Sequence, residues 1–501
     1  MKQLIKFCSL AVPLIYFFQG IGKHYFWQDI LYPAFFVVLF KLYRLSMVFL
    51  GTMLVVLLVS YPTVCIAQTG NKGDKNMGPE LIVVPKQVLI GDPFSIRVNG
   101  LSAGQVGSLA VSGQDQFGNV WSSMASFQVN ETGTIDTSRD VPFEGSYQGA
   151  DQAGLFWSMT CKQTSEYVSP FVIMRNLTVT LLVDGQEKEN QVIERIAYLD
   201  LEKQDLTEPI VGVFFKPQEV TEPTPALIVL GGSEGGYNQG WAAVLASKTR
   251  LPTLALAYFG LKGLPPTLEN IPLETLEEAM HWLNQQPIVK KDYFGLIGAS
   301  RGGELAILAA SVFPQIKAVV GYTPSGVIWG GIGDEQVPAW TYRGKPFPYL
   351  MMMTNEEQHK LFLEAQEKST TYIDEPSFLY SLKMQQSRIP EATIPVEKSK
   401  AAFLLIGNPQ DGVWPSQMLS KITIDRLQAH NHPRTFELLS YDNGGHMLIP
   451  YPYYPTTMRK FYLPTINIWE GLGGTAEAAA KAAEDSWPKV IDFLHHELQS
   501  E

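Results

Sequence analysis

The run Gly298-Ala-Ser300-Arg-Gly302 places a serine between two glycines, directly after an apolar stretch and directly before a helical one. This spacing is typical of a nucleophile elbow, a sharp strand-to-helix turn that holds the serine in strained backbone. The flanking glycines leave room for the turn, which projects the hydroxyl away from the sheet. The turn also places the N–H of Arg301 at a helix N-terminus, where it can stabilise an oxyanion. The motif therefore predicts Ser300 as a nucleophile for acyl chemistry.

A second match, Gly231-Gly-Ser233-Glu-Gly235, also follows an apolar run, residues 226–230. This run is the first strong strand of its region, so it comes too early for an elbow on the fifth strand of an α/β-hydrolase. The glycine-rich loop after an early strand is instead where the second oxyanion N–H arises. We assign Gly232, Ser233 and Glu234 to that loop, with Ser233 as the alternative nucleophile.

A serine nucleophile needs a base, and the base needs an acid to orient it. In this fold the chain order is serine, acid, histidine. Of the seven histidines after residue 67, only His446 lies in a glycine turn just after a late strand-like run. The acid should follow the preceding run, residues 403–407, after which Asp411 is the carboxylate that comes first. The predicted catalytic set is Ser300, Asp411 and His446, with Asp425 and Asp442 as weaker choices for the acid.

The region around these residues, 209–501, alternates compact β-type runs with helical stretches. Such alternation predicts a mostly parallel sheet covered by helices on both faces, an α/β-hydrolase domain in this context. The stretch from 323 to about 398 breaks the rhythm and is rich in Pro, Met and aromatic residues, so we expect a cap insertion over the site. The expected strands are 226–230, 254–258, 294–298, 318–322, 403–407 and 436–441, and the expected helices include 276–285 and 304–311.

Residues 79–205 show short apolar or alternating runs, separated by turn residues at intervals of roughly ten. This pattern predicts an N-terminal antiparallel β-sandwich, immunoglobulin-like in type. A sandwich alone carries no chemistry, so we interpret this region as a packing or recognition module. Its expected strands include 80–84, 94–98, 127–129 and 177–185.

The composition narrows the classes of function. The 501 residues carry 38 basic and 49 acidic side chains, a net charge of -11. This balance argues against a nucleic-acid partner, because phosphate binding needs a dense basic face. With 3 cysteines the chain is no disulfide-stapled mini-protein. No Cys/His metal-ligand spacing is present, so we expect neither a metal nor a cofactor.

Residues 1–67 hold five basic side chains, one acidic side chain and a long apolar run that ends before Cys65-Ile-Ala67. This arrangement predicts a secretory signal with cleavage after Ala67. Two alternatives stay open. Translation begins near Met47, or residues 30–60 remain as a membrane anchor, since about 20 apolar residues cross a bilayer. In each case we expect an exported or membrane-anchored protein that touches the membrane through this segment only.

Several further runs carry a family resemblance. In the first region these are Val98-Asn-Gly-Leu101, Gly118-Asn-Val-Trp121 and Gly154-Leu-Phe-Trp157. In the second they include Gly295-Leu-Ile-Gly-Ala-Ser300-Arg-Gly-Gly-Glu304 and Gly445-His446 followed by Pro450-Tyr-Pro452. From about Glu80 to the C-terminus, the chain resembles the acyl-CoA thioesterase / bile acid-CoA:amino acid N-acyltransferase (BAAT) family.

The resemblance implies a serine acyl-enzyme mechanism on fatty acyl-CoA, yielding free fatty acid and CoA. His446 would deprotonate Ser300, and the N–H groups of Arg301 and of the 232–234 loop would hold the oxyanion. The amine-transferring branch typically uses cysteine as the nucleophile, so a serine favours hydrolysis. The family also implies a cap that either lines an acyl channel or merely packs. Its large apolar residues are Met351, Met352, Met353, Trp329, Trp340, Tyr342, Phe347 and Tyr349.

Two features depart from the family pattern. Glu234 puts a negative charge into a loop that usually holds small residues, which weakens anion stabilisation if the carboxylate points inward. An export signal also conflicts with CoA, a cytoplasmic metabolite. The alternatives are therefore an acyltransferase acting on an amine, an exported carboxylesterase on a non-CoA ester, and a binding protein that kept the scaffold. Acyl length and oligomeric state are not readable from the sequence.

Overall fold

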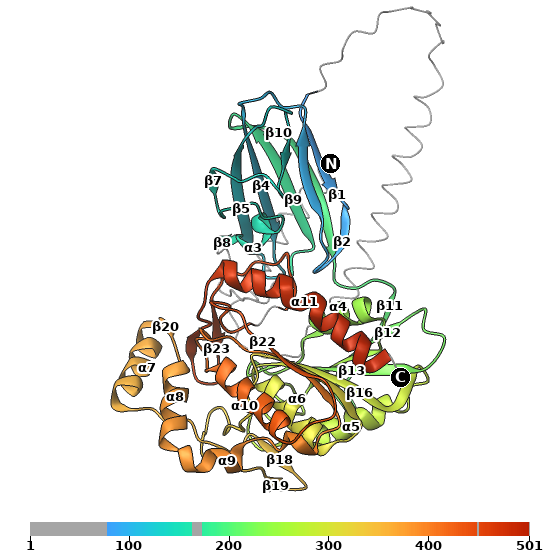
Figure 1. Ribbon diagram of the computed structural model, residues 1–501, viewed down its shortest axis with the longest axis vertical. Coiled ribbons are helices and arrows are strands. Elements are labelled where there is room, and N and C mark those ends of the chain that lie inside the picture. The colour runs from blue at the N-terminus through green and yellow to red at the C-terminus, as the bar shows by residue number, and fades with distance from the viewer. Residues whose placement is uncertain (1–77, 163–172, 448–449, 500–501) are drawn as a thin grey trace, which may run out of the picture. The chain divides into compact units, whose positions relative to one another are not determined.

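The computed structural model describes residues 78–162, 173–447 and 450–499 (Figure 1). Residues 76–501 form one compact unit. The predicted signal or anchor segment, 1–67, lies outside the described residues. Among the residues that are described, no helix has the length and apolar character needed to span a membrane.

The N-terminal part is a sandwich of two β-sheets, as the alternating runs predict. The smaller sheet has the order β1-β3-β6, and the larger has the order β2-β10-β9-β4-β5-β7, with β8 paired to β5. All pairings are antiparallel except that of β2 with β10. The strands are β1 (Glu80–Val84), β2 (Gln87–Leu89), β3 (Ser95–Asn99), β4 (Val106–Gln114), β5 (Val120–Gln128), β6 (Ile135–Asp136), β7 (Glu144–Gly145), β8 (Thr160–Lys162), β9 (Asn176–Val183) and β10 (Gln186–Ile196).

Strict alternation in β9 builds the interior of the sandwich. Leu177, Val179, Leu181 and Val183 are all buried, whereas the residues between them keep solvent contact. They join Trp121 and other apolar side chains from both sheets in one hydrophobic core. The short helix α3 (Gly154–Trp157), which the strand pattern did not predict, closes one end of this core with four buried residues.

The C-terminal part is built on an eight-stranded sheet with the order β11-β12-β14-β13-β16-β17-β21-β22. β11 and β12 are antiparallel to their neighbours, and every pairing from β14 to β22 is parallel. All six predicted strands fall in this sheet. Its strands are β11 (Leu201–Leu206), β12 (Val211–Pro217), β13 (Thr224–Leu230), β14 (Thr253–Ala257), β16 (Val289–Ala299), β17 (Ile316–Tyr322), β21 (Ala402–Ile406) and β22 (Phe436–Leu439).

The start of this sheet differs from the prediction. The predicted sandwich extends to residue 205, but β11 pairs with β12 in the eight-stranded sheet. β11 is an edge strand whose four central residues are exposed and polar, so its sequence lacks the apolar pattern of the inner strands. The run 226–230 is therefore the third strand of this sheet in chain order. Because residues 76–501 form one compact unit, the division into two separate domains stays a prediction.

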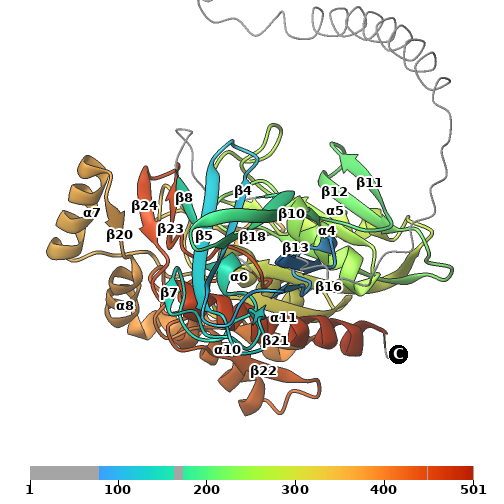
Figure 2. The ribbon, with the colours of Figure 1, turned by 90° about the horizontal axis from the view of Figure 1, so that it is seen from above.

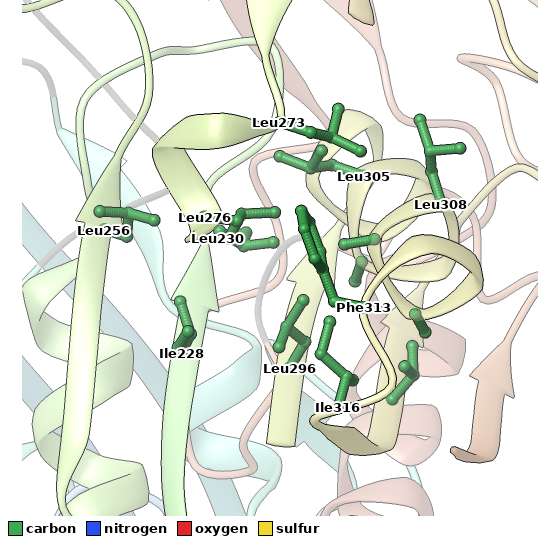
Figure 3. Close-up of a cluster of buried hydrophobic side chains, with 14 of the residues drawn as sticks. Ile228, Leu230, Leu256, Leu273, Leu276, Leu296, Leu305, Leu308, Phe313 and Ile316 are labelled. Carbon is green, nitrogen blue, oxygen red and sulfur yellow. The ribbon is translucent and has the colours of Figure 1, made fainter. Parts of the chain in front are cut away.

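Successive residues of the parallel strands point to opposite faces of the sheet. Leu227 and Val229 pack with α4 (Gln239–Thr249) and α11 (Ala476–Gln499). Ile228 and Leu230 pack on the other face, against α5 (Glu274–Leu283) and α6 (Arg301–Val312) (Figure 3). α10 (Ser416–Ala429) covers the same face as α6 through Leu427. Burying each such side chain stabilises the fold by about 1.5–3 kcal/mol.

Between β17 and β21 the chain leaves the sheet, as expected for a cap insertion. β20 (Thr371–Tyr372) pairs with β24 (Ile468–Gly471), which pairs with β23 (Lys460–Leu463), and this ties the segment to the C-terminal part (Figures 1 and 2). β18 (Trp340–Tyr342) joins β15 (Ile271–Pro272) and β19 (Lys345–Pro346) in another small sheet. The helices of the segment are α7 (Glu356–Lys368), α8 (Glu375–Met384), η1 (Gln386–Arg388), α9 (Ile389–Ala392) and η2 (Val396–Lys398).

Candidate active site

Ser300 occupies the turn between β16 and α6. Its backbone has φ +54° and ψ −123°, a combination that L-residues rarely adopt. Its N–H donates to the Tyr322 carbonyl at 2.8 Å, and the residue is buried to all but 6%. Arg301 begins α6, so its N–H is one of the first-turn donors that have no partner within the helix. The geometry is that of the predicted elbow.

The neighbouring glycines are required by close backbone contacts. A Cβ atom on Gly298 would lie 2.3 Å from the carbonyl oxygen of Gly302, and one on Gly302 would lie 2.1 Å from that of Gly231. Both distances are far below van der Waals contact. The elbow is thus packed directly against the loop after β13, which brings both GxSxG runs to one place.

His446 and Asp411 form a buried pair. Nδ1 of His446 lies 2.8 Å from Oδ2 of Asp411, and the two residues are 1% and 2% exposed. The other oxygen, Oδ1, accepts the N–H groups of Val413 at 2.9 Å and Trp414 at 3.3 Å. These bonds fix the carboxylate, which in turn fixes the imidazole and leaves Nε2 for a proton transfer. The weaker candidate Asp425 instead pairs with Lys421 in an exposed ion pair on α10.

Trp414 links this pair to the serine. Its ring centroid lies 6.2 Å from that of His446, and the same side chain lines the pocket that Ser300 opens into. Among the described residues, no hydrogen bond joins the Ser300 hydroxyl to His446. Catalytic hydrogen bonds are often long in ligand-free proteins and tighten when substrate binds.

The predicted oxyanion loop lies beside Ser300. A Cβ atom on Gly232 would be 3.3 Å from Cβ of Ser300. The N–H of Gly232, however, donates to Oε1 of Glu234 at 3.0 Å. The carboxylate therefore holds one of the N–H groups that were predicted to stabilise an oxyanion. Desolvation by the surrounding protein raises the pKa of Glu234, while its backbone hydrogen bonds and the charge of His446 lower it.

The side chain of Arg301 serves a different purpose from its N–H. Nη1 forms a buried ion pair with Oε2 of Glu304 at 3.1 Å, and Nη2 donates to the carbonyls of Trp329 and Gly330 at 3.1 and 2.9 Å. Oε1 of Glu304 also accepts the indole N–H of Trp340 at 2.6 Å. Burial raises the pKa of Glu304 to about 7, against the lowering effect of Arg301. This network fastens the cap insertion to the helix that carries the serine.

The pocket in front of Ser300 has a volume of about 100 Å³. One wall is aromatic: the rings of Trp329 and Phe378 meet edge to face at 4.7 Å, and Phe378 meets Trp414 at 5.6 Å. Ser233, the alternative nucleophile, also lines the pocket. The remaining lining includes Arg301, Met352, Val413, Leu463, Ile466 and the carboxyl residues Glu335, Asp374 and Glu470.

The apolar cap residues fall into two groups. Trp329 and Met352 line the pocket, whereas Trp340 is wholly buried against Glu304. Tyr342, Phe347 and Tyr349 pack against the core beneath α6.

Asp374 and Glu470 were missed by the sequence reasoning. They lie 96 positions apart in chain order, on the cap and on β24, and no spacing rule connects them. Their proximity follows from the pairing of Tyr372 with Glu470 across β20 and β24. In the described part of the chain, no three His, Cys, Asp or Glu side chains gather in a way that could hold a metal ion.

Comparison with known proteins identifies both regions. Residues 91–205 match the family described as "Acyl-CoA thioester hydrolase/BAAT N-terminal region", and residues 271–500 match "BAAT / Acyl-CoA thioester hydrolase C terminal". The chain is 29% identical to acyl-coenzyme A amino acid N-acyltransferase 1 of Mus musculus over 84% of its own length and 98% of that protein. It is 28% identical to acyl-coenzyme A thioesterase 1 of Homo sapiens over 81% of its length and 94% of that protein.

A solved esterase from Pyrococcus furiosus is also similar, at 15% identity and a TM-score of 0.34, covering 60% of this chain and 92% of that one. The family matches confirm the predicted order, a β-rich N-terminal region followed by an α/β-hydrolase domain.

Proposed function

Because the chain belongs to the acyl-CoA thioester hydrolase/BAAT family, we propose that it hydrolyses acyl-CoA thioesters through an acyl-enzyme on Ser300. The observation that carries this proposal is the buried hydrogen bond between His446 and Asp411, together with a serine in elbow geometry whose pocket is lined by Trp414, a ring neighbour of His446. A lone serine at such a turn has no base, and a lone His–Asp pair has no nucleophile. The two features support acyl transfer because they occur together.

In the proposed reaction, Nε2 of His446 takes the proton of the Ser300 hydroxyl as its oxygen attacks the thioester carbonyl. Asp411 stabilises the resulting imidazolium through Nδ1. The N–H of Arg301 stabilises the oxyanion from the helix N-terminus. The C–S bond then breaks, His446 returns its proton to the leaving thiolate, and a water molecule activated by His446 releases the acid.

Transfer of the acyl group to an amine is the second candidate. The similarity to the mouse N-acyltransferase supports it, because 98% of that protein is covered. Both reactions share the acyl-serine intermediate and differ only in whether water or an amine resolves it. The serine at position 300 favours water.

The test is thiol release from short, medium and long acyl-CoAs by the full chain and by Ser300→Ala. We expect a loss of about a thousandfold or more, because a nucleophile acts as one unit with its base and acid. Ser233→Ala is the matched control, since it removes the serine of the other GxSxG run, and it should keep most of the activity. An unchanged rate in Ser300→Ala would contradict the proposal.

We further propose that residues 1–67 direct export, a proposal that rests on their sequence pattern alone. Expression of the full chain, cell fractionation and N-terminal sequencing would test it. A new terminus at Gln68 outside the cytoplasm supports cleavage, and an intact chain in the membrane fraction supports an anchor. A soluble cytoplasmic product would contradict both.

A further inference from the structure

The pocket in front of Ser300 is acidic. Three of its lining residues carry carboxyl groups, Glu335, Asp374 and Glu470, and among the residues that the structure describes Arg301 is the one cation in the lining. Arg301 is already bound to Glu304 and to two backbone carbonyls. The pocket therefore offers carboxyl groups to a ligand, and the one cation among its described lining residues already has partners.

Glu470 is the residue that points most directly to a ligand. It is only 6% exposed, it lines the pocket, and no hydrogen-bond partner for its carboxyl is present among the described residues. Ionising a buried carboxyl is costly unless a cation accompanies the charge. Such a group indicates that a partner of complementary chemistry comes from outside the chain.

The charged groups around Glu470 are mostly carboxyls. Asp374 follows β20, whose Tyr372 pairs with Glu470. Burial is the largest cause of the raised pKa of Glu470, and the charges of Asp374 and Asp411 raise it further. Burial likewise raises the pKa of Asp374 to about 7 and Glu335 raises it further, whereas a hydrogen bond with the Ser377 side chain lowers it. Asp374 is the N-cap residue of α8 and also lines the pocket.

The pocket is also lined by the rings of Trp329, Phe378 and Trp414. Aromatic faces attract ammonium groups through the ring quadrupole, by roughly 2 kcal/mol or more when the cation is desolvated. Carboxyl groups and aromatic rings that line the same small cavity match a cation better than the phosphates of CoA.

We propose that Glu470 and Asp374 bind an ammonium group of a substrate beside Ser300, with the aromatic wall enclosing it. This deepens the proposed function and rests on it, because the ammonium belongs either to the acyl group or to an amine acceptor. The volume of about 100 Å³ suits a short chain of a few heavy atoms. CoA itself then lies outside this pocket.

The first experiment measures protection of Ser300 in the full chain against labelling by a fluorophosphonate. The probes are n-butylamine and 1-butanol, which match in size and differ in charge. We expect half-protection at an amine concentration at least about tenfold lower than that of the alcohol. Each protein is normalised to its own labelling rate without a probe.

The variants Glu470→Gln and Asp374→Asn keep the side-chain shape and remove the charge. Each should raise the half-protecting concentration of n-butylamine by about tenfold and leave that of 1-butanol unchanged. Glu364→Gln, which removes an exposed carboxylate on α7, is the matched control and should change neither value. Equal protection by amine and alcohol in the unmodified chain, or an amine advantage that survives both variants, would overturn the proposal.

A second experiment identifies the source of the ammonium. β-Alanyl-CoA and butyryl-CoA differ only in an ammonium group in place of a methyl group. A higher kcat/KM for the β-alanyl thioester, reversed by Glu470→Gln, assigns the ammonium to the acyl group. Formation of N-butylbutyramide from butyryl-CoA and n-butylamine assigns it to the acceptor. If neither outcome is observed and the amine does not protect Ser300, the proposed ammonium site is wrong.

Failure of the proposed function would look different. If Ser300 does not react and no thioester turns over, the hydrolase proposal falls, but calorimetric titration of n-butylamine into the same variants still tests the pocket. If Ser300 reacts and butyryl-CoA is cleaved while the amine does not bind, the ammonium site falls and the hydrolase proposal stands.

Discussion

Two buried glutamates flank the serine, and their surroundings are opposite. Glu304, on α6, meets the guanidinium of Arg301 and accepts two N–H groups, those of Trp340 and Trp329. Glu470, on β24, has the carboxyls of Asp374 and Asp411 as its electrostatic neighbours. Both are at least nine-tenths buried. The same side chain is therefore placed once where the protein supplies its partners and once where it does not.

The difference separates structural from functional use of a buried charge. A buried ion pair in which one carboxylate oxygen also accepts two N–H groups holds its neighbours in a fixed geometry, as Glu304 and Arg301 do for the cap. A buried carboxyl among other carboxyls lowers stability, and stability is commonly lost in this way where a site is shaped for a ligand. Removing the cation beside Glu304 should therefore destabilise the protein, and supplying a cation to Glu470 should stabilise it.

The largest expected effect on stability comes from removing the cation beside Glu304, so that this carboxyl, like that of Glu470, has no charged partner. Arg301→Met removes the guanidinium and keeps an apolar chain of similar length. We expect the free energy of unfolding to fall by about 3–5 kcal/mol, because the buried Glu304 carboxyl loses its charged partner. Urea unfolding monitored by tryptophan fluorescence measures this loss. Arg343→Met, which breaks the exposed pair with Glu277, is the control and should leave the unfolding midpoint where it is.

A loss no greater than that of the control would show that Glu304 does not depend on Arg301. The two glutamates would then differ in their place in the fold and not in how their partners affect stability.

Sequence reasoning predicted the catalytic set and missed the acidic residues of the pocket beside it. Ser300, Asp411 and His446 lie in local patterns, a glycine-flanked turn and two loops after strands, so chain order alone predicted where each would come. The parallel core strands were predictable for the same reason, because burial on both faces produces continuous apolar runs. Glu470 carries no local signal, since its neighbours in space come from the cap.

Charge and edge position hid other features. β11 is a polar edge strand and therefore does not look like part of an α/β sheet. The inward turn of Glu234 depends on a hydrogen bond to the N–H of Gly232, two residues earlier, which no spacing rule predicts. Both features depend on three-dimensional neighbours rather than on the local run of residues.

Binding of a cation by Glu470 and Asp374 should depend on pH. The pKa of Asp374 is raised to about 7, so below that value its carboxyl is protonated and attracts a cation less strongly. An alkylammonium stays charged throughout, since its pKa is near that of lysine, about 10.4. We expect the half-protecting concentration of n-butylamine to be roughly tenfold higher at pH 6 than at pH 8.

Protection by 1-butanol should not change over the same range, which controls for the pH dependence of labelling itself. The exposed rim residue Glu335 and the buried Asp411 also face this cluster, so Asp374→Asn is needed to assign the effect. A pH dependence that persists in Asp374→Asn would place the titrating group elsewhere.

Removing the charge of Glu470 should stabilise the protein. Burial raises the pKa of this carboxyl in the folded state, so its contribution to stability is present at low pH and is lost as pH rises through the folded value. Glu470→Gln cannot ionise. The variant should therefore exceed the parent in unfolding free energy by about 1 kcal/mol at pH 8. At pH 4 the two should be equal. A destabilised variant at pH 8 would show that the carboxylate has a partner within the protein.

Glu234 is the intermediate case, and it gives the smallest expected effect. Its carboxylate accepts the N–H of Gly232, which is a group that an oxyanion would use. Before the N–H can serve the transition state, the carboxylate has to release it. Glu234→Ala removes that competition and a nearby negative charge, so we expect thioester kcat to rise about threefold. Glu234→Gln keeps the hydrogen bond without the charge, and its kcat should fall between those of the parent and the alanine variant. A decrease in both variants would mean that this carboxylate assists the reaction. Glu234 would then have a functional role, as proposed for Glu470, rather than a structural one.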